Sequence, residues 1–377
     1  MDNGVRLFAP WTDRDVSFES GCSTDYFLPM KIALLLSGGV DSAVSLNLLK
    51  REGHDLTAFY IKVWLEDELA YLGNCPWEED LMYARAICHQ AGVPLEIVSL
   101  QSEYWERVVS YVLAELKAGR TPSPDIFCNQ RIKFGAFYDK IDLSFAAVAS
   151  GHYAVLEKNN GSVILKKGVD PVKDQTYFLF HLSAAQLSRA LFPVGAYPKS
   201  DVRRLAREFA LPNQDRKDSQ GICFLGKIKY REFVKFHLGE KPGNFIEKAT
   251  GKKIGAHRGY WYYTIGQRQG MGLPGGPWFV VGKEIDENIV YIAHQEQLKE
   301  ARRNEFRAEA IHWINGAPNK DHLQVKIRHS PRVFNARIAI ENGRALVTLA
   351  DRDAGVAPGQ FSVFYDGEIC LGGGVIV

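Results

Sequence analysis

The stretch KIALLLSGGVDSAVSLNLLK, residues 31–50, decides how this chain begins to fold. Its apolar run 32–36 predicts a buried strand, and residues 43–50 predict a helix. Between them lies the loop 37–42, Ser-Gly-Gly-Val-Asp-Ser. Adjacent glycines let successive N–H groups curl around an anion, the serines add hydroxyls, and the helix N-terminus adds partial positive charge. A simple tight turn needs only one glycine, so the loop predicts a phosphate-binding site.

The same alternation of strands and helices continues to about residue 211. Apolar runs at 56–63, 95–100 and 146–149 are separated by helical stretches, which is typical of a parallel sheet with helices on its faces. One helical stretch, 105–116, has apolar residues three and four positions apart and ends before a glycine. We therefore predict an α/β domain with a parallel sheet.

The pattern changes after residue 211. A helix is expected near 230–238, followed by hairpin-like alternation through 251–292. From about residue 306 onward, short alternating strands and turns at Asn342-Gly343 and Asp366-Gly367 predict a small antiparallel barrel. The barrel strands are expected at 324–328, 333–340, 345–349 and 360–365. The predicted division is a loosely ordered extension over 1–29, a nucleotide-binding domain over 30–211, a central basic domain over 212–285 and a C-terminal β-barrel over 286–377.

Composition excludes several classes of protein. The chain has 377 residues, 46% hydrophobic and 24% charged, which rules out collagen-like, disordered and disulfide-scaffold proteins. Its apolar runs are far shorter than the ~18 residues that span a bilayer, so no membrane partner is expected. The N-terminus lacks a basic segment followed by an apolar one, so no secretory signal is predicted. A cytoplasmic location with reduced cysteines is expected.

Positive charge is concentrated in one segment. The formal net charge is only +2, but residues 227–268 contain ten basic and three acidic side chains. The aromatic residues in the same segment are Tyr230, Tyr260, Trp261, Tyr262 and Tyr263. Cations beside stacking surfaces suit a polyanion with exposed bases. A solvated, lysine-rich surface is the alternative.

Two of the six cysteines are expected in polar loops. Cys128 follows Pro-Asp-Ile-Phe and opens a predicted helix that contains Arg131 and Lys133. Cys223 lies in the other predicted polar loop, a few residues after Lys217. Because nearby cations favour the thiolate, both are candidate reactive sulfurs.

The other cysteines are expected to be unreactive. Cys88, on the apolar face of a predicted helix, is expected to pack in a core, as are Cys22 and Cys370. Cys75 stays undecided. No C-x-x-C motif occurs, so no zinc or other metal site is predicted.

The loop 37–42 resembles the PP-loop of ATP pyrophosphatases, which split ATP between the α- and β-phosphates and adenylate an acceptor oxygen. It is not a Walker loop, because it has no lysine to reach the β- and γ-phosphates. Six further motifs narrow the family: Pro-Asp-Ile-Phe-Cys-Asn (124–129), Ser-Gly-His-Tyr-Ala (150–154), Lys-Asp-Gln-Thr-Tyr-Phe-Leu (173–179), Gly-Ile-Cys-Phe (221–224), Tyr-Thr-Ile-Gly-Gln-Arg (263–268) and Ala-Pro-Gly-Gln (357–360). With them, the chain from Met30 onward resembles the tRNA-specific 2-thiouridylases of the bacterial and organellar type.

That resemblance implies an enzyme, a tRNA-uridine 2-sulfurtransferase. ATP, expected with Mg²⁺, would adenylate O2 of uridine-34, and a persulfide sulfur would then displace AMP. Cys223 would carry the persulfide, Cys128 would be the nucleophile that closes a Cys128–Cys223 disulfide, and Asp125 would be the general acid or base. The implied partners are tRNAs, with Lys, Glu and Gln acceptors, and a cysteine desulfurase or sulfur-relay protein.

The resemblance also implies binding residues. Those for ATP are Leu35, Leu36, Ser37, Gly38, Gly39, Val40, Asp41, Ser42, Ile61 and Gly151. Those for tRNA are Ser123, Pro124 and Asp125 at the target base, and His152, Lys173, Asp174, Gln175, Arg328, His329 and Gln360 elsewhere. Three residues depart from the family pattern, because Ser123 replaces Asn, Ile61 replaces Met and His329 replaces Tyr.

Several assignments have a plainer alternative. His152 could be a loop histidine with a structural partner, Asp125 could cap a turn, and Gln360 could shape a barrel turn. Residues 173–175 could be ordinary turn residues, although they are expected to enter an apolar strand that holds them rigidly. An iron–sulfur cluster held by Asp125, Cys128 and Cys223 also stays open.

Two other functions compete with thiolation. One is a PP-loop synthetase that adenylates a small molecule, for which the basic segment and the barrel would have no purpose. The other is a non-catalytic tRNA-binding protein that has kept the barrel. An intact phosphate loop together with two loop cysteines argues against the second.

Overall fold

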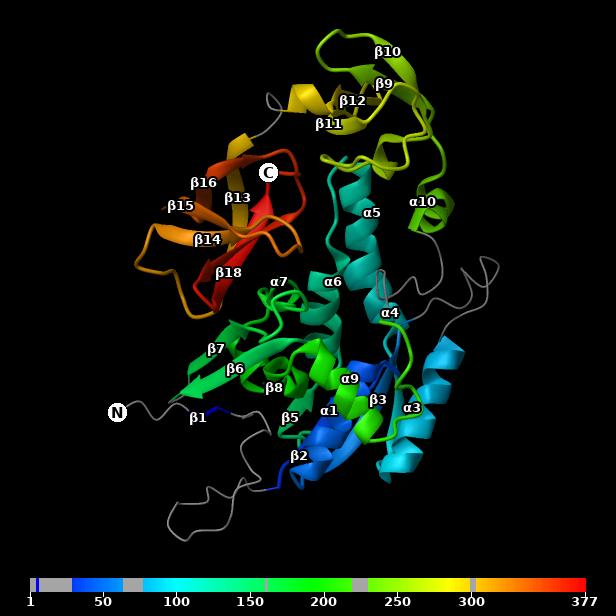
Figure 1. Cartoon of the computed structure of the whole chain (residues 1–377), viewed down its shortest axis with the longest axis vertical. Coiled ribbons are helices and arrows are strands. Elements are labelled where there is room, and N and C mark those ends of the chain that lie inside the picture. The colour runs from blue at the N-terminus through cyan, green and yellow to red at the C-terminus, as the bar shows by residue number, and fades with distance from the viewer. Residues whose placement is uncertain (1–4, 7–28, 64–76, 160–161, 219–229, 299–302) are drawn as a thin grey trace.

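The first domain is built on a five-stranded parallel sheet (Figure 1). The computed structural model describes residues 5–6, 29–63, 77–159, 162–218, 230–298 and 303–377. The sheet has the order β4-β3-β2-β5-β8, and all neighbouring strands are parallel. Its strands are β2 (Lys31–Leu35), β3 (Asp55–Lys62), β4 (Leu95–Ser99), β5 (Ala147–Ala149) and β8 (Ala190–Leu191). The predicted α/β domain is confirmed.

Both faces of the central strand β2 are buried. Ile32 and Leu34 of β2 pack in one apolar cluster, and Ala33 and Leu35 pack in another on the opposite face. A strand buried on both faces needs apolar residues at every position, which explains the continuous run in the sequence. Helices α1 (Val40–Arg51), α3 (Trp77–Ala91) and α9 (Lys199–Glu208) supply the first cluster. Cys88 is buried in that cluster, and burial raises its pKa to about 11, so its predicted packing role is confirmed.

The helix predicted over 105–116 is present as a longer helical run. It consists of α4 (Gln101–Tyr104), the π-helical turn η3 (Trp105–Val109) and α5 (Ser110–Lys117). Gly119, with φ +72°, ends it by donating its N–H to the Leu116 carbonyl at 3.0 Å. The next helical run carries the first candidate cysteine and consists of α6 (Pro124–Phe127) and η4 (Cys128–Ala136).

The C-terminal domain is a closed antiparallel barrel. Its strands follow the order β18-β13-β16-β15-β14-β17, and β17 pairs back with β18 to close the ring. The strands are β13 (Arg303–Trp313), β14 (His322–Lys326), β15 (Phe334–Glu341), β16 (Arg344–Asp353), β17 (Phe361–Asp366) and β18 (Ile369–Ile376). Asn342 and Gly343 both have positive φ, 51° and 73°, as a two-residue hairpin turn requires. The predicted barrel is confirmed.

A hairpin from the first domain extends the barrel sheet. Strands β6 (Ala154–Asn159) and β7 (Ser162–Lys167) pair with each other, and β7 pairs with β18. The short strand β1 (Val5–Arg6) adds to the outer edge of β6. The remaining short helical elements of this domain are α7 (Thr176–Leu179), α8 (Ala184–Ser188) and η5 (Pro193–Ala196). The first domain and the barrel therefore share backbone hydrogen bonds.

In the part of the chain that the structure describes, the central domain has one α-helix and a four-stranded sheet, at the far end of α5 from the parallel sheet (Figure 1). The helix, α10 (Tyr230–Leu238), lies at the predicted position. The other elements are β9 (Gly243–Glu247), β10 (Lys253–His257), η6 (Tyr260–Tyr262), β11 (Trp278–Glu284), β12 (Ile289–His294) and η7 (Gln295–Gln297). Because β12 pairs with β9 and β11, this sheet continues past residue 285.

Three aromatic residues of the basic segment are not the stacking surfaces that the sequence suggested. Tyr260, Trp261 and Tyr263 are buried, because the turn η6 and the residue that follows it place them in the apolar cluster. That part of the prediction is wrong. The side chains of Lys235 and Arg258 are exposed, so the domain keeps a basic surface.

Candidate active site around the phosphate loop

The loop 37–42 forms a tight turn between β2 and α1. Gly38 has φ +75°, and a Cβ there would lie 2.4 Å from the carbonyl oxygen of Asp80, so only glycine fits. The hydroxyls of Ser37 and Ser42 lie 3.3 Å apart, and the Ser42 hydroxyl donates to the Gly39 carbonyl at 3.0 Å. The loop thus places two hydroxyls beside the N-terminus of α1.

Only some residues of the predicted ATP site can use their side chains. Leu35, Leu36 and Val40 are buried in the core. They can contribute only backbone groups to a nucleotide. Ile61 lies at the C-terminal end of β3, and Gly151 packs directly on the loop, since a Cβ at 151 would lie 2.7 Å from the amide nitrogen of Ser42. These positions suit the predicted adenine pocket, which stays a prediction.

Asp41, in the first turn of α1, binds two groups from elsewhere in the chain. Lys199 Nζ lies 2.6 Å from Asp41 Oδ1, and the Tyr153 hydroxyl donates to the same oxygen at 2.8 Å. Burial, followed by the charge of Asp41, raises the pKa of Tyr153, so that hydroxyl stays protonated. The Lys199 ammonium also lies 2.8 Å from Asp218 Oδ1. Lys199 therefore joins the phosphate loop to Asp218.

Asp218 is held by three cations. Besides Lys199, it binds Lys173 at 2.6 Å and Arg203 at 2.5 Å. Burial alone would raise the pKa of Asp218, but the hydrogen bonds from Lys173 and Lys199 outweigh it and lower the pKa to about 2. Asp218 precedes Cys223 by five residues. Cys223 itself lies outside the described residues, so its predicted role stays a prediction.

A second set of contacts holds the other side of the loop. Arg216 Nη1 and Asn213 Nδ2 donate to the Gly38 carbonyl at 3.1 and 2.9 Å. Arg216 also pairs with the carboxylate of Asp80 in the first turn of α3. These side chains fix the loop from its carbonyl side and do not bind its amide groups.

Cys128 lies in a different environment from the one expected. It is not in a polar loop but is the first residue of η4, with its side chain 3% exposed in an apolar cluster. The reason is that α6 continues directly into η4, which turns Cys128 toward the core. Asp125 lies three residues earlier in α6, so both side chains are on the same helical face. Their predicted chemical roles stay predictions.

The segment 150–152 connects this helix to the phosphate loop. Gly151 packs on the loop, and the ring of His152 packs on Phe134 of η4 at a centroid distance of 6.2 Å. The Ser150 hydroxyl and His152 Nδ1 share a hydrogen bond of 2.7 Å. Burial, followed by the charge of Lys133, lowers the pKa of His152 well below its ordinary value. His152 is thus a neutral spacer between the two halves of the site, and its contact with tRNA stays a prediction.

The three domains meet at the loop that leads to Pro124. Lys283 Nζ of β11 donates to the Gly119 carbonyl at 2.9 Å, and the Tyr260 hydroxyl donates to the Lys117 carbonyl at 2.6 Å. From the barrel side, the Pro358 carbonyl accepts the Thr121 N–H at 2.9 Å. The central domain and the barrel therefore both contact the segment just before Ser123, Pro124 and Asp125.

Residues 173–175 do not enter a strand, which corrects that expectation. They precede the short helix α7, and Asp174 is buried in an ion pair with Lys326 of β14 at 2.9 Å. The Gln175 side chain accepts the Tyr153 N–H at 3.0 Å. Residues 173–175 therefore lie at the junction between the first domain and the barrel, where the buried Asp174 carboxylate is paired with Lys326. Contact of Lys173, Asp174 and Gln175 with tRNA stays a prediction.

The barrel candidates lie near the same junction. Arg328 pairs with the buried Asp353 at 3.2 Å, and the ring of His329 packs on Phe178 at 4.4 Å. Gln360 follows Gly359, whose φ is +88°, so the expected turn is present. A Cβ at Gly359 would lie 2.8 Å from Arg120 Cβ, which brings Gln360 close to the Pro124 loop. Their tRNA contacts stay predictions.

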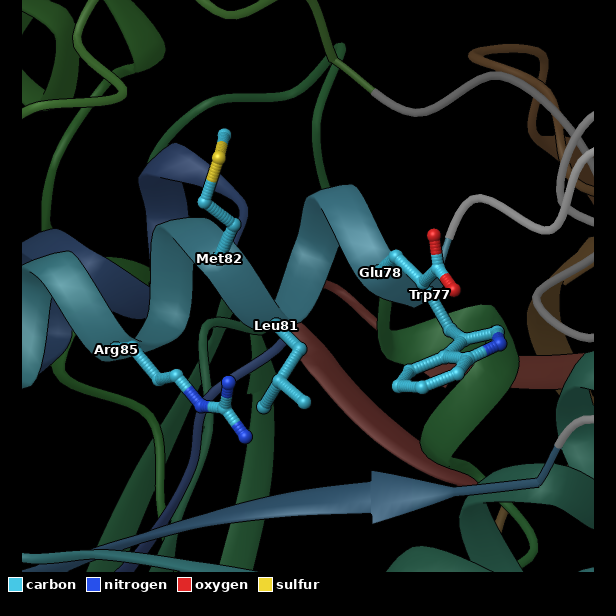
Figure 2. A pocket seen from close by; sticks show the side chains of 5 residues that line it. All are labelled: Trp77, Glu78, Leu81, Met82 and Arg85. Atoms are coloured by element: carbon cyan, nitrogen blue, oxygen red, sulfur yellow. The ribbon is translucent and has the colours of Figure 1, made fainter.

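A cavity of about 380 Å³ lies beside the first half of α3. Figure 2 shows Trp77, Leu81 and Arg85 projecting from one side of this helix. Lys62 Nζ lies 4.8 Å from the Trp77 ring centroid, so α3 begins next to the predicted adenine wall at Ile61. No predicted site residue lines the cavity.

Two features are absent from the residues that the structure describes. No three His, Cys, Asp or Glu side chains in that part of the chain are grouped as metal ligands. The iron–sulfur alternative includes Cys223, which lies outside the described residues. Within the same residues, no helix combines the length and apolarity needed to cross a bilayer.

Comparison with known proteins agrees with this architecture. Residues 30–227 match the tRNA methyl transferase HUP domain model, residues 231–294 the tRNA methyl transferase PRC-barrel domain model, and residues 303–376 the aminomethyltransferase beta-barrel domain model. A tRNA-specific 2-thiouridylase MnmA 1 of Bacteroides thetaiotaomicron is 46% identical over 355 residues, covering 92% of this chain and 99% of the relative. The chain belongs to the tRNA-specific 2-thiouridylase family. Other relatives of that name from Parabacteroides distasonis and Porphyromonas gingivalis are each 43% identical, again over 92% of this chain and 99% of their own length.

Membership in the thiouridylase family was predictable from contiguous motifs, but part of the site was not. Tyr153, Lys199, Asn213, Arg216 and Asp218 all bind the loop or its partners, and none was predicted. Arg216 and Asp218 lie a few residues before the Gly-Ile-Cys-Phe motif at 221–224, which is a weak signal. Lys199 opens an ordinary amphipathic helix, so the sequence contained no signal for it.

Proposed function

We propose that this protein is a tRNA 2-thiouridylase, which uses ATP to activate O2 of uridine-34 and then replaces that oxygen with sulfur. The observation that supports this most is the position of Gly151 and His152. They pack against the phosphate loop on one side and against the helix that begins with Cys128 on the other. Nucleotide and sulfur chemistry can therefore occur in one region of the molecule.

The first step is adenylation. Uracil C2 is a poor electrophile because its oxygen is a poor leaving group. Transfer of AMP to O2 turns that oxygen into a good leaving group. The N–H groups at the start of α1 and the hydroxyls of Ser37 and Ser42 bind the phosphates, which reach the enzyme as the Mg²⁺ complex. Ile61 and Gly151 line the adenine pocket. Pyrophosphate leaves in this step.

The second step transfers sulfur. The terminal sulfur of a Cys223 persulfide attacks C2 and AMP leaves. The Cys128 thiolate then attacks the inner sulfur, which forms a Cys128–Cys223 disulfide and frees 2-thiouridine. Both thiols are oxidised, so a cellular thiol must reduce the disulfide before the next turnover. Asp125, on the face of α6 shared with Cys128, moves the proton at this site.

Chain length is compatible with this relay. Asp218 is fixed beside the phosphate loop through Lys199. Cys223 follows it by five positions, and a chain of that length spans at most about 18 Å. The chain is thus long enough for Cys223 to reach the phosphate loop, where the proposed relay needs it.

The tRNA contacts the other two domains and the Pro124 loop. Exposed cations such as Lys235 and Arg258, and the exposed ring of Phe236 on α10, suit an RNA backbone and an unstacked base. The substrates are the tRNAs that accept lysine, glutamate and glutamine. A cysteine desulfurase or a relay protein supplies the sulfur. We expect tRNA affinity to fall steeply with salt, since phosphate contacts release counterions.

In vitro thiolation tests the proposal. Purified protein, ATP, Mg²⁺, a persulfide donor and tRNA are combined, and thiolated tRNA is resolved on a mercury-containing gel. Retarded tRNA is expected for the wild type and for Cys88→Ala, a matched control at a core cysteine. No retardation is expected for Cys128→Ser, Cys223→Ser or a tRNA with cytidine at position 34. Thiolation by Cys223→Ser would disprove the relay.

A further inference from the structure

The phosphate loop contains no cation of its own. Its six residues include an aspartate instead, and a carboxylate in the first turn of α1 repels the polyphosphate of ATP. Other nucleotide loops place a lysine against the β- and γ-phosphates. A side-chain cation for this site, in addition to the Mg²⁺ that arrives with ATP, must therefore come from another part of the fold.

Lys199 occupies the required position. Its Nζ lies 2.6 Å from Asp41 Oδ1, directly against the first turn of α1, and its side chain is 14% exposed. The helix that carries it is rigidly placed, since Val202, Leu205 and Ala206 of α9 pack in the same cluster as α1. In addition, the Lys199 N–H donates to Asp170 Oδ2 at 3.0 Å, which fixes the start of α9.

The other cation at the loop has a different role. Arg216 binds the Gly38 carbonyl and Asp80, so its guanidinium is on the carbonyl side of the turn. Phosphates bind at the amide side of such a loop. Arg216 therefore shapes the loop, whereas Lys199 lies beside the Asp41 side chain in the first turn of α1.

The bonding of Lys199 leaves it able to bind an anion. An ammonium has three N–H donors, and the described contacts, to Asp41 and Asp218, engage two of them. Asp41 has a second donor in the Tyr153 hydroxyl, and Asp218 has two further cations in Lys173 and Arg203. The ammonium can thus turn partly toward a phosphate without leaving either carboxylate unpaired.

We propose that Lys199 is a nucleotide-binding residue that contacts the polyphosphate of ATP and stabilises pyrophosphate as it leaves. It takes the place of the lysine missing from the loop. A fixed cation aimed at the leaving group stabilises the charge that develops on it during adenylation. This inference rests on the proposed use of ATP, and its test measures nucleotide binding without tRNA or sulfur, so it can fail while thiolation stands.

The test compares ligands with and without the two outer phosphates. Calorimetry measures binding of the Mg²⁺ complex of α,β-methylene ATP, which cannot be split at that bond, and binding of AMP. For Lys199→Met we expect affinity for the ATP analogue to fall about 10- to 100-fold, as for loss of a charge-assisted hydrogen bond, with AMP affinity within about twofold of wild type. Lys199→Arg is expected to retain more affinity than Lys199→Met.

Arg203→Met is the matched control. It removes another cation that binds Asp218 but does not contact Asp41. We expect it to leave the affinity for both ligands unchanged. An equal loss of analogue binding in both variants would overturn the proposal, because the loss would then come from Asp218. Unchanged analogue binding in Lys199→Met, or an equal loss for AMP, would overturn it too.

A double variant separates phosphate binding from charge neutralisation. If Lys199 only cancels the charge of Asp41, Lys199→Met has no effect in an Asp41→Asn background. We expect the loss of analogue affinity to persist there at about tenfold or more. Its disappearance would overturn the proposal. Thermal melting checks that each variant is folded, and Lys199→Gln provides a second neutral variant if Lys199→Met does not fold.

Discussion

Two lysine–aspartate pairs in this molecule have similar distances but very different surroundings. Asp174 and Lys326 lie 2.9 Å apart with side chains 1% and 4% exposed, between the first domain and the barrel. Asp41 and Lys199 lie 2.6 Å apart with side chains 29% and 14% exposed, at the phosphate loop. The first pair is closed to solvent and the second is accessible to a ligand.

The difference shows how the same two residue types serve two purposes. Asp174 Oδ1 also accepts hydrogen bonds from the N–H and hydroxyl of Thr176, so little of its bonding capacity is left for an outside group. A buried charge without its partner is strongly destabilising. The buried pair therefore orients two domains, whereas the accessible pair can exchange part of its bonding with a nucleotide.

The largest effect is expected at the buried pair. Lys326→Met leaves the Asp174 carboxylate without a cation in the core, and we expect the free energy of unfolding to fall by ~3–5 kcal/mol. Urea denaturation followed by circular dichroism measures it. Asp174→Asn combined with Lys326→Met removes both charges and should recover most of the loss. If Lys326→Met lowers the free energy of unfolding by less than the double variant does, then an unpaired Asp174 carboxylate is not the cause of the loss.

A second effect at the same junction depends on pH. His181 stacks on His312 of β13 at 5.0 Å, and burial, followed by the charges of His312 and Arg131, lowers the pKa of His181 to about 4. The unfolded chain binds this proton near pH 6.5, so stability is full above 6.5 and is lost as the pH falls toward 4.

The expected loss between pH 7.5 and pH 5 is about 2 kcal/mol from this group. Urea denaturation at both pH values measures it. His181→Phe keeps a ring in the stack but cannot titrate, so the part of the loss due to His181 should vanish in that variant. An identical pH dependence in wild type and variant would show that this histidine is not responsible.

The smallest effect is expected at the accessible pair. Lys199→Met should lower the free energy of unfolding by less than about 1 kcal/mol, because partly exposed ion pairs contribute little and both carboxylates keep other donors. The same urea series measures it. A loss as large as that of Lys326→Met would mean that Lys199 is a structural residue, and the contrast between the two pairs would disappear.

Some elements were visible in the sequence because their signals are local. The loop 37–42 has its strand, turn and helix within twenty residues, and the barrel hairpin at Asn342-Gly343 has its turn residues in sequence. The strands β8 and β18 were not visible. The first has two residues, and the second contains Gly372, Gly373 and Gly374, which carry no hydrophobic pattern.

The glycines of β18 illustrate why. A Cβ at Gly372 would lie 2.1 Å from the His312 carbonyl, and one at Gly373 would lie 2.4 Å from the Ser362 carbonyl. These residues are glycine because neighbouring strands approach closely, and that closeness exists only in the closed barrel. The burial of Cys128 is similar, since it depends on what packs around η4 and not on the polar residues beside it.

The sequence by itself determined the phosphate loop, the parallel sheet, the barrel and the family, because each depends on residues close together in the chain. Tertiary structure alone decided which cations meet Asp41 and which aspartate is buried. Lys199 and Lys326 are ordinary lysines in their own segments. Their roles differ because packing excludes water from one and leaves the other beside a site that can hold phosphate.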